Sequence, residues 1–173
     1  LLTIVSQRQT GARLVLIRLN GDRLELSAES PAVGTPMRWL NPVGVADLDG
    51  DGRAELASVT TPHLGGALKV YRREGARLVE IAALDGFSNH VYGSPELGLS
   101  AHQTVAKQVR LLVPDNSRRQ LRVIEFNSGR LAEVGRCALP ALVTGTIKPL
   151  AGSEVSVGLA TGRHVLLSDE CKL

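Results

Sequence analysis

Aromatic residues are scarce in this chain of 173 residues, since one Trp, two Tyr and two Phe make up 3% of it. Long apolar runs are missing too, and no stretch reaches the roughly 18 residues that a membrane-spanning helix needs. We therefore predict no membrane span. A nucleic-acid surface is also disfavoured, because no concentrated basic stripe with interleaved aromatic side chains is present.

Cysteine is nearly absent as well. Cys137 and Cys171 are the only two, and both lie late in the chain among polar residues. Their spacing fits neither a zinc-binding pattern nor a Cys-x-x-Cys redox motif. Two alternatives stay open: a disulfide formed in an oxidising compartment, or no bond between them.

Common signatures of catalysis are lacking. The sequence contains no Gly-x-Ser-x-Gly nucleophile elbow, and its glycine-rich stretches lack the Walker pattern. The four His are scattered along the chain. These absences favour a binding or structural protein over an enzyme.

Aliphatic residues and turn formers are abundant, with 43% hydrophobic residues, 18 Gly and 8 Pro. Short segments alternate apolar and polar residues, and nothing sustains a helical period for more than a turn or two. This pattern predicts an all-β fold with many turns. The net charge is +3, mostly from arginines that alternate with apolar residues. Such alternation is typical of solvated strand faces, with a site for acidic polysaccharide as the alternative.

Self-comparison reveals an internal repeat. Similar segments surround Gly21, Gly75 and Gly129, which are 75 − 21 = 54 and 129 − 75 = 54 residues apart. A second marker agrees, because Gly44 and Gly98 are 98 − 44 = 54 residues apart. Periods near 50 residues that contain many short strands are typical of β-propeller blades.

The repeat divides one propeller-type region into four units: residues 1–42, 43–96, 97–143 and 144–173. We predict strands in the second unit at Val43–Asp47, Glu55–Thr60, Ala67–Arg72 and Arg77–Ala83, and in the third at Leu97–Ser100, Val109–Val113, Gln120–Phe126 and Arg130–Cys137. The first unit begins at Leu1–Ser6, which matches the second strand of a blade; the last has strands at Thr144–Leu150, Glu154–Ala160 and His164–Ser168. We expect about two complete four-stranded blades plus two partial ones, in a portion of a larger propeller or in one completed by a second chain.

The most distinctive motif is the acidic segment Asp47-Leu48-Asp49-Gly50-Asp51-Gly52-Arg53-Ala54-Glu55. Its clustered carboxylates repel one another unless a cation lies between them, and Ca²⁺ suits them because it takes six to eight oxygen ligands. Gly50 and Gly52 permit the backbone angles of a tight loop. An EF-hand is disfavoured, because its twelfth loop position requires Glu and here is Ser58.

With its flanking strands, the segment from Gly44 to Ala57 resembles the FG-GAP/VCBS repeat of integrin alpha-subunit propellers and many bacterial surface proteins. The resemblance implies a β-propeller with Ca²⁺ between the first two strands of a blade. It implies side-chain ligands at Asp47, Asp49 and Asp51, a backbone carbonyl from Arg53, and a final acidic ligand at Glu55. A shift of 54 residues places Ala101, Gln103 and Val105 at the aspartate positions of the third unit, so we expect a single, structural calcium site.

Loops between the predicted units hold the remaining candidates. Asn89, His90 and Tyr92 lie in one such loop, and Trp39 occupies the comparable place in the preceding unit. These side chains either contact a ligand, with Trp39 stacking on a sugar, or pack within their own loops and between blades. The sequence therefore predicts a non-enzymatic, calcium-binding propeller module for protein binding or assembly outside the cytoplasm. A carbohydrate-binding or carbohydrate-active propeller and a structural subunit of a larger envelope complex are the alternatives.

Overall fold

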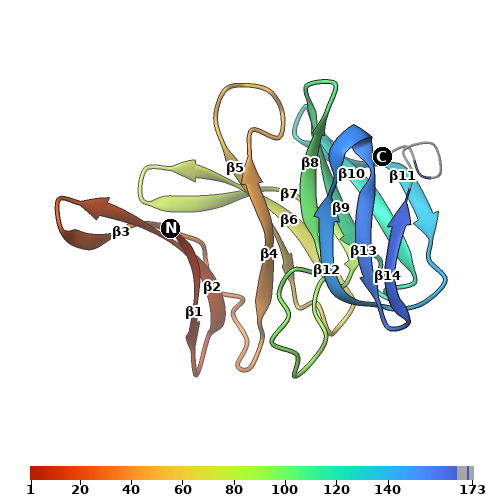
Figure 1. The fold of residues 1–173 in the computed structure, drawn as a ribbon. Helices are drawn as coiled ribbons and strands as arrows, with labels where there is room; N and C mark the ends of the chain where they lie inside the picture. The colour runs from red at the N-terminus through yellow and green to blue at the C-terminus, as the bar shows by residue number, and fades with distance from the viewer. Residues whose placement is uncertain (167–170, 172–173) are drawn as a thin grey trace.

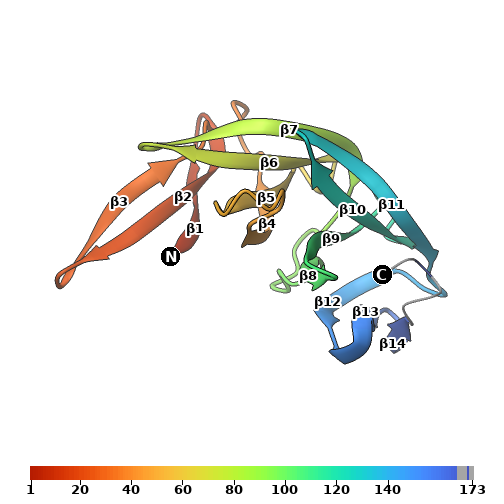
Figure 2. The same ribbon diagram turned by 90° about the horizontal axis from the view of Figure 1, so that it is seen from above.

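The computed structural model describes residues 1–166 and 171, and β-strands dominate this part of the chain. Successive strands run antiparallel and are joined by turns or loops, and groups of them stand side by side in an open arc (Figures 1 and 2). The predicted all-β class is confirmed. No helix within the described residues is long and apolar enough to cross a membrane.

The strands form four sets in chain order. The first set is β1 (Leu2–Gln7), β2 (Gly11–Asn20) and β3 (Arg23–Glu29); the second is β4 (Leu40–Ala46), β5 (Glu55–Thr60), β6 (Gly66–Glu74) and β7 (Arg77–Phe87). The third set is β8 (Ala101–Val105), β9 (Gln108–Pro114), β10 (Gln120–Asn127) and β11 (Arg130–Ala138). The fourth is β12 (Val143–Pro149), β13 (Val155–Leu159) and β14 (Gly162–Leu166), with the 3₁₀ turn η1 (Ala151–Ser153) between its first two strands.

The first two sets share one sheet in the order β1-β2-β3-β7-β6-β5-β4. Their link is narrow, because β3 and β7 pair in parallel only at Glu29 and Arg77. The third and fourth sets are separate sheets in the described part of the chain. Within each set every pairing is antiparallel, as expected for strands that follow one another through short connections.

Most predicted strands coincide with observed ones, but the strand predicted at Leu97–Ser100 is wrong. Those residues form a loop, and the strand begins at Ala101 instead. The reason lies in the following turn: Ala106 and Lys107 alone join β8 to β9, with φ of 49° and 71°. The corresponding connection of the second set, between β4 and β5, is longer and comprises residues 47–54. The first strands of the two sets, β4 and β8, therefore do not follow the 54-residue period. The strand predicted at His164–Ser168 is observed as far as Leu166, and its last two residues lie outside the described residues.

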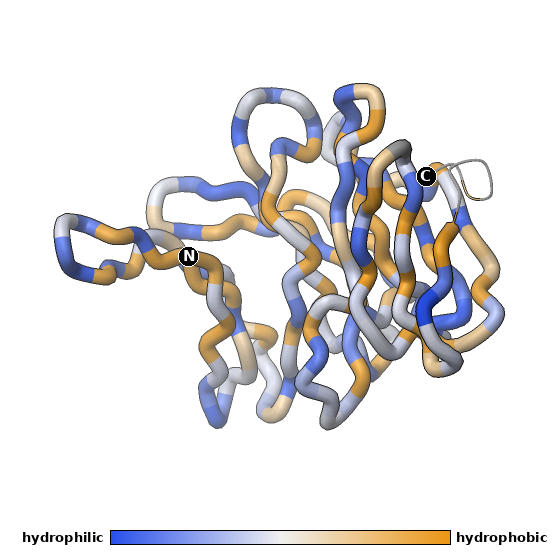
Figure 3. Tube along the Cα trace, in the orientation of Figure 1, coloured by the Kyte–Doolittle hydropathy of each residue, from blue (hydrophilic) through white to orange (hydrophobic). Residues whose placement is uncertain are grey.

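Apolar layers lie between neighbouring sets. Successive residues of a strand point to opposite faces, so Leu56 packs in a cluster with Leu14 of the first set, whereas Ala57 packs in a cluster with Ile124 and Phe126 of the third. A further cluster joins the third set to the fourth. The second and third sets therefore bury both faces, and apolar residues recur along their strands in Figure 3.

A disulfide joins Cys137 of β11 to Cys171. This finding decides between the two alternatives that the sequence left open. The bond closes a loop with a sequence separation of 34 that contains the whole fourth set. It therefore ties the end of that loop back to the last strand of the third set.

We expect the double variant Cys137→Ser/Cys171→Ser to unfold more easily than the wild type. Opening a loop of this size restores chain entropy to the unfolded state, at a cost of about 3–4 kcal/mol in the free energy of unfolding. Urea unfolding followed by circular dichroism measures the difference. Reductant should lower the wild-type midpoint to that of the variant, and an unchanged wild-type midpoint would contradict the expectation.

Candidate functional site

The candidate residues gather at opposite ends of the strand sets. The acidic segment forms the connection between β4 and β5, the tall loop at the top of Figure 1. Trp39, His90 and Tyr92 lie in the β3–β4 and β7–β8 connections at the bottom of the same view. Because strands alternate in direction, every second connection returns to the same end.

Hydrogen bonds within the acidic segment fix its shape. The two carboxylate oxygens of Asp47 accept from the amides of Gly50 (2.9 Å) and Gly52 (3.0 Å). The Oδ1 of Asp51 accepts from the amide of Arg53 at 2.8 Å. Gly50 and Gly52 have φ of 78° and 85°, the left-handed region that glycine adopts at little cost. The predicted role of the two glycines is confirmed.

Glu55 holds the acidic segment in place through hydrogen bonds. This first residue of β5 is completely buried, and its Oε2 accepts from the amide of Leu48 at 3.0 Å. Its Oε1 accepts from the Nε (3.1 Å) and Nη2 (3.0 Å) of Arg72. The same Nη2 donates to Oδ2 of Asp49 at 2.7 Å. These bonds to Glu55 and then Asp49 raise the pKa of the Arg72 guanidinium.

Asp47, Asp49 and Glu55 each place a carboxylate oxygen within 4.8 Å of the others. Oxygens on opposite sides of one Ca²⁺ ion are separated by about 4.8 Å, twice a typical Ca–O distance. These three groups are close enough together that they could hold one metal ion. Asp51 stands outside the cluster, with Oδ2 at 3.6 Å from Nη2 of Arg72. Arg53 contributes its amide to the loop's own hydrogen bonds.

Arg72 was not predicted as part of this site, although the sequence holds a signal for it. Leu56 of β5 pairs with Tyr71 of β6, so the next step of the register sets Glu55 opposite Arg72. The predicted strands Glu55–Thr60 and Ala67–Arg72 give the same pairing when they are joined as a hairpin. Arg72 already supplies positive charge to the carboxylates, and a metal ion would share them with it.

At the other end, four rings from three connections lie together. Ring centroids are 4.6 Å apart for Trp39 and His90, 5.0 Å for His63 and His90, and 5.5 Å for His63 and Tyr92. The structure thus brings together the three residues that the sequence analysis named and adds His63 from the β5–β6 connection. No local pattern around His63 signals this, because its neighbours come from distant segments.

The histidine pair has defined hydrogen-bond roles. His90 Nε2 lies 2.9 Å from the carbonyl oxygen of Ser94, which can only accept, so this nitrogen carries hydrogen. His90 Nδ1 then accepts from His63 Nε2 at 2.8 Å when both rings are neutral. Partial burial lowers the pKa of His63, and the nearby His90 and Arg118 lower it further.

A buried amide pair holds the β7–β8 connection in place. Asn41 donates to the carbonyls of Asn89 (3.0 Å) and Leu97 (2.9 Å), while Asn89 donates to the carbonyl of Asn41 (3.1 Å) and to Ser100 (3.0 Å). Asn89, grouped with the ligand candidates by sequence, therefore positions the loop from inside. This network positions the connection that carries His90 and Tyr92.

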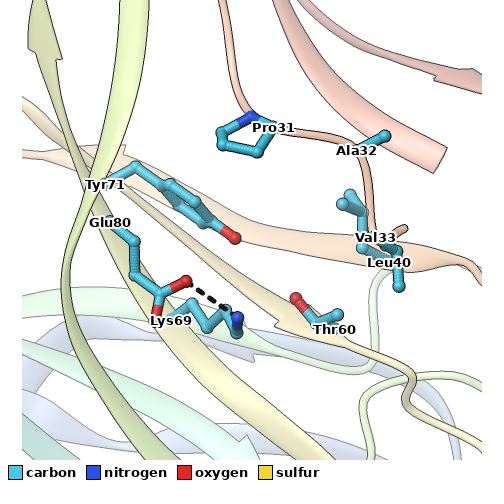
Figure 4. Close-up of a pocket in the computed structure, with 8 residues that line it drawn as sticks. All are labelled: Pro31, Ala32, Val33, Leu40, Thr60, Lys69, Tyr71 and Glu80. Atoms are coloured by element: carbon cyan, nitrogen blue, oxygen red, sulfur yellow. Dashed lines mark hydrogen bonds and ion pairs between the residues drawn. The ribbon is translucent and has the colours of Figure 1, made fainter. Parts of the chain in front are cut away.

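A separate small cavity lies between the β3–β4 connection and the second set (Figure 4). Tyr71 and the ion pair of Lys69 and Glu80 (2.8 Å) line it, and burial raises the pKa of the Tyr71 hydroxyl. Its volume of about 90 Å³ is well below the roughly 300 Å³ of small-molecule sites. We assign this cavity to imperfect packing of the β3–β4 connection on the second set.

Comparison with models of known families and with curated proteins finds no match to this chain. The resemblance to FG-GAP/VCBS repeats thus rests on the acidic segment and the repeat alone.

Glu55→Ala should destabilise the fold by about 2–3 kcal/mol. The substitution leaves the buried Leu48 amide without its acceptor and removes one of the two carboxylates to which Arg72 donates. Urea unfolding measures the loss, with Asp22→Ala in the exposed β2–β3 turn as the matched control. The control should stay within about 0.5 kcal/mol of the wild type, and an equally small effect of Glu55→Ala would contradict the expectation.

Acid should weaken the fold through His63. Its pKa lies below the ordinary 6.5 in the folded chain, so the unfolded chain takes up the proton first as pH falls. The contribution of His63 is fully present above about pH 6.5 and is lost on acidification toward its folded-state pKa. The wild type should therefore lose more unfolding free energy than His63→Gln between about pH 7 and pH 5. Equal losses, or an NMR titration midpoint of His63 at or above 6.5, would refute this.

Proposed function

We propose that this chain is a non-enzymatic, calcium-binding β-propeller module for protein binding or assembly outside the cytoplasm. The observation that carries the proposal is the cluster of Asp47, Asp49 and Glu55 at the end of a four-stranded set stacked between two others. The strand sets would be blades, two of them with four strands and two with three. The disulfide supports an oxidising location, because such bonds persist mainly outside the cytoplasm.

Ca²⁺ is the cation that this loop suits best. The cluster offers carboxylate oxygens from two aspartates and one glutamate. Ca²⁺ accepts irregular shells, whereas Mg²⁺ demands a near-ideal octahedron. The side chain of Asp51 and the carbonyl of Arg53 would complete the shell. Because Arg72 already bonds to Glu55 and Asp49, the ion has to compete with it. We expect weak binding, with a Kd on the order of 10⁻⁴ to 10⁻³ M, as in extracellular modules.

Calorimetric titration with Ca²⁺ tests the site. The wild type and Asp22→Ala should bind alike, whereas Asp49→Ala should lose measurable binding. Arg72→Gln should bind more tightly than the wild type, because it removes the competing cation and keeps the three carboxylates. Identical binding by the wild type and Asp49→Ala would contradict the calcium proposal.

An incomplete set supports the assembly role. Leu1 and Ile17 exchange both backbone hydrogen bonds, so Leu2, Ile4 and Ser6 turn their N–H and C=O groups to the outer edge of β1. In the described residues β1 pairs only with β2, whereas the comparable strands β5 and β9 each carry a further strand at this edge. A further strand from another part of the protein or from a partner would fit there.

The outer face of the first set also supports the assembly role. Leu19 pairs with Leu24 and Ile17 with Leu26, which places these side chains on the face away from the second set. Leu19 and Leu24 are each 69% exposed and Leu26 is 61% exposed. They lie on the β2–β3 hairpin that projects at the left of Figures 1 and 3, where apolar segments are visible. A neighbouring sheet covers the inner faces of the other sets. We propose that a further sheet likewise covers the outer face of the first set.

The 173-residue chain should therefore associate with itself through this face. Leu24→Lys places a charge at its centre and should shift sedimentation velocity profiles toward the monomer. Leu150→Lys, at a residue that is 45% exposed near the fourth set, is the matched control and should sediment like the wild type. A wild type that stays monomeric at tens of micromolar, or an unchanged Leu24→Lys, would count against the assembly role.

A further inference from the structure

Three shallow hollows adjoin one another at the end that carries the ring cluster. Trp39 and Met37 border both the first, of about 400 Å³, and the second, of about 180 Å³. His63 and Tyr92 border both the second and the third, of about 220 Å³. The shared residues make the hollows one continuous row, which suits a chain-like ligand better than a single small molecule.

The middle of the row is unusually apolar for a surface. Tyr92 is 87% exposed, Met37 90% and Leu64 60%, and all three line the same hollow beside Trp39. Exposed apolar groups gathered in one place mark a binding site more often than scattered ones do. Aromatic rings such as Tyr92 and Trp39 combine a flat apolar face with a polar edge, which matches the C–H face and the hydroxyl rim of a sugar ring.

The charge of the row has one sign. Arg8, Arg38 and Arg118 line it, and no Asp or Glu does. None of the three arginines takes part in an ion pair among the described residues. The Nη1 atom of Arg118 is buried without a hydrogen-bond partner. Arg118 as a whole is only half-buried and lines the third hollow, so its positive charge is available to an anionic group there.

From these observations we propose that the row binds an anionic oligosaccharide. Its sugar rings stack on Tyr92 and Trp39, and its carboxylate or sulfate groups accept hydrogen bonds from Arg118 and Arg38. The site lies at the opposite end of the strands from the acidic segment, so it does not depend on calcium.

The single Trp of the chain lies in the row, so its fluorescence reports binding directly. The 173-residue chain is titrated with a hexuronic acid oligosaccharide, a sulfated oligosaccharide and a neutral one of equal length. At least one anionic probe should bind, and the neutral one at least about tenfold more weakly. Tyr92→Ala and Arg118→Gln should each weaken binding about tenfold. Arg130→Gln, at an exposed arginine of the other end, should leave binding unchanged.

Circular dichroism confirms that each variant is folded; Tyr92 is so exposed that its truncation should not disturb the core. Asp49→Ala, which removes the proposed metal site, should bind the probe like the wild type and so separates the two proposals. The saccharide proposal is overturned if neither anionic probe binds, or if both row variants bind like the wild type. Equal or tighter binding of the neutral probe, an acidic peptide or single-stranded DNA would overturn it too.

Discussion

The structure depends on the covering of both faces of the second and third strand sets. In the second set, Leu56 faces the first set and its neighbour Ala57 faces the third, so neither layer can be removed without exposing the other side of the same strand. Burial of apolar area drives this stacking at roughly 25 cal/mol per Å². Stacking also brings the connections of different sets together at the two ends. The candidate sites are consequences of that arrangement, because each is assembled where connections meet.

The acidic loop combines carboxylates of the kind that bind metal ions with a positively charged side chain of the protein itself, Arg72. Glu55 is completely buried, and a buried carboxylate needs partners that its Leu48 and Arg72 bonds supply. These bonds hold the ends of β4 and β5 without a metal. A calcium ion would then add to a loop that is already shaped, which fits weak binding and a supporting role. The ring end works differently, since its exposed side chains and unpaired arginines leave interactions for a ligand to make.

Much of the fold follows from local patterns. Glu55–Thr60 is predicted and observed with the same bounds, because short apolar stretches and turn signals act over a few residues. The strand at Leu97–Ser100 was wrong, since the period was assumed to hold through a loop whose length differs between sets. Asp47, Asp49 and Glu55 were predictable from spacing along one loop. Arg72 required the pairing register of β5 and β6, and His63 required knowledge of which connections share an end.

The sequence by itself determined the all-β class, most strand positions and the shape of the acidic loop, because these depend on residues close together in the chain. It could not decide the Cys137–Cys171 bond or the meeting of Trp39, His63 and Tyr92. Those contacts join residues from different strands or connections. Only the stacking of the strand sets brings them within bonding distance, and no short-range pattern encodes that stacking.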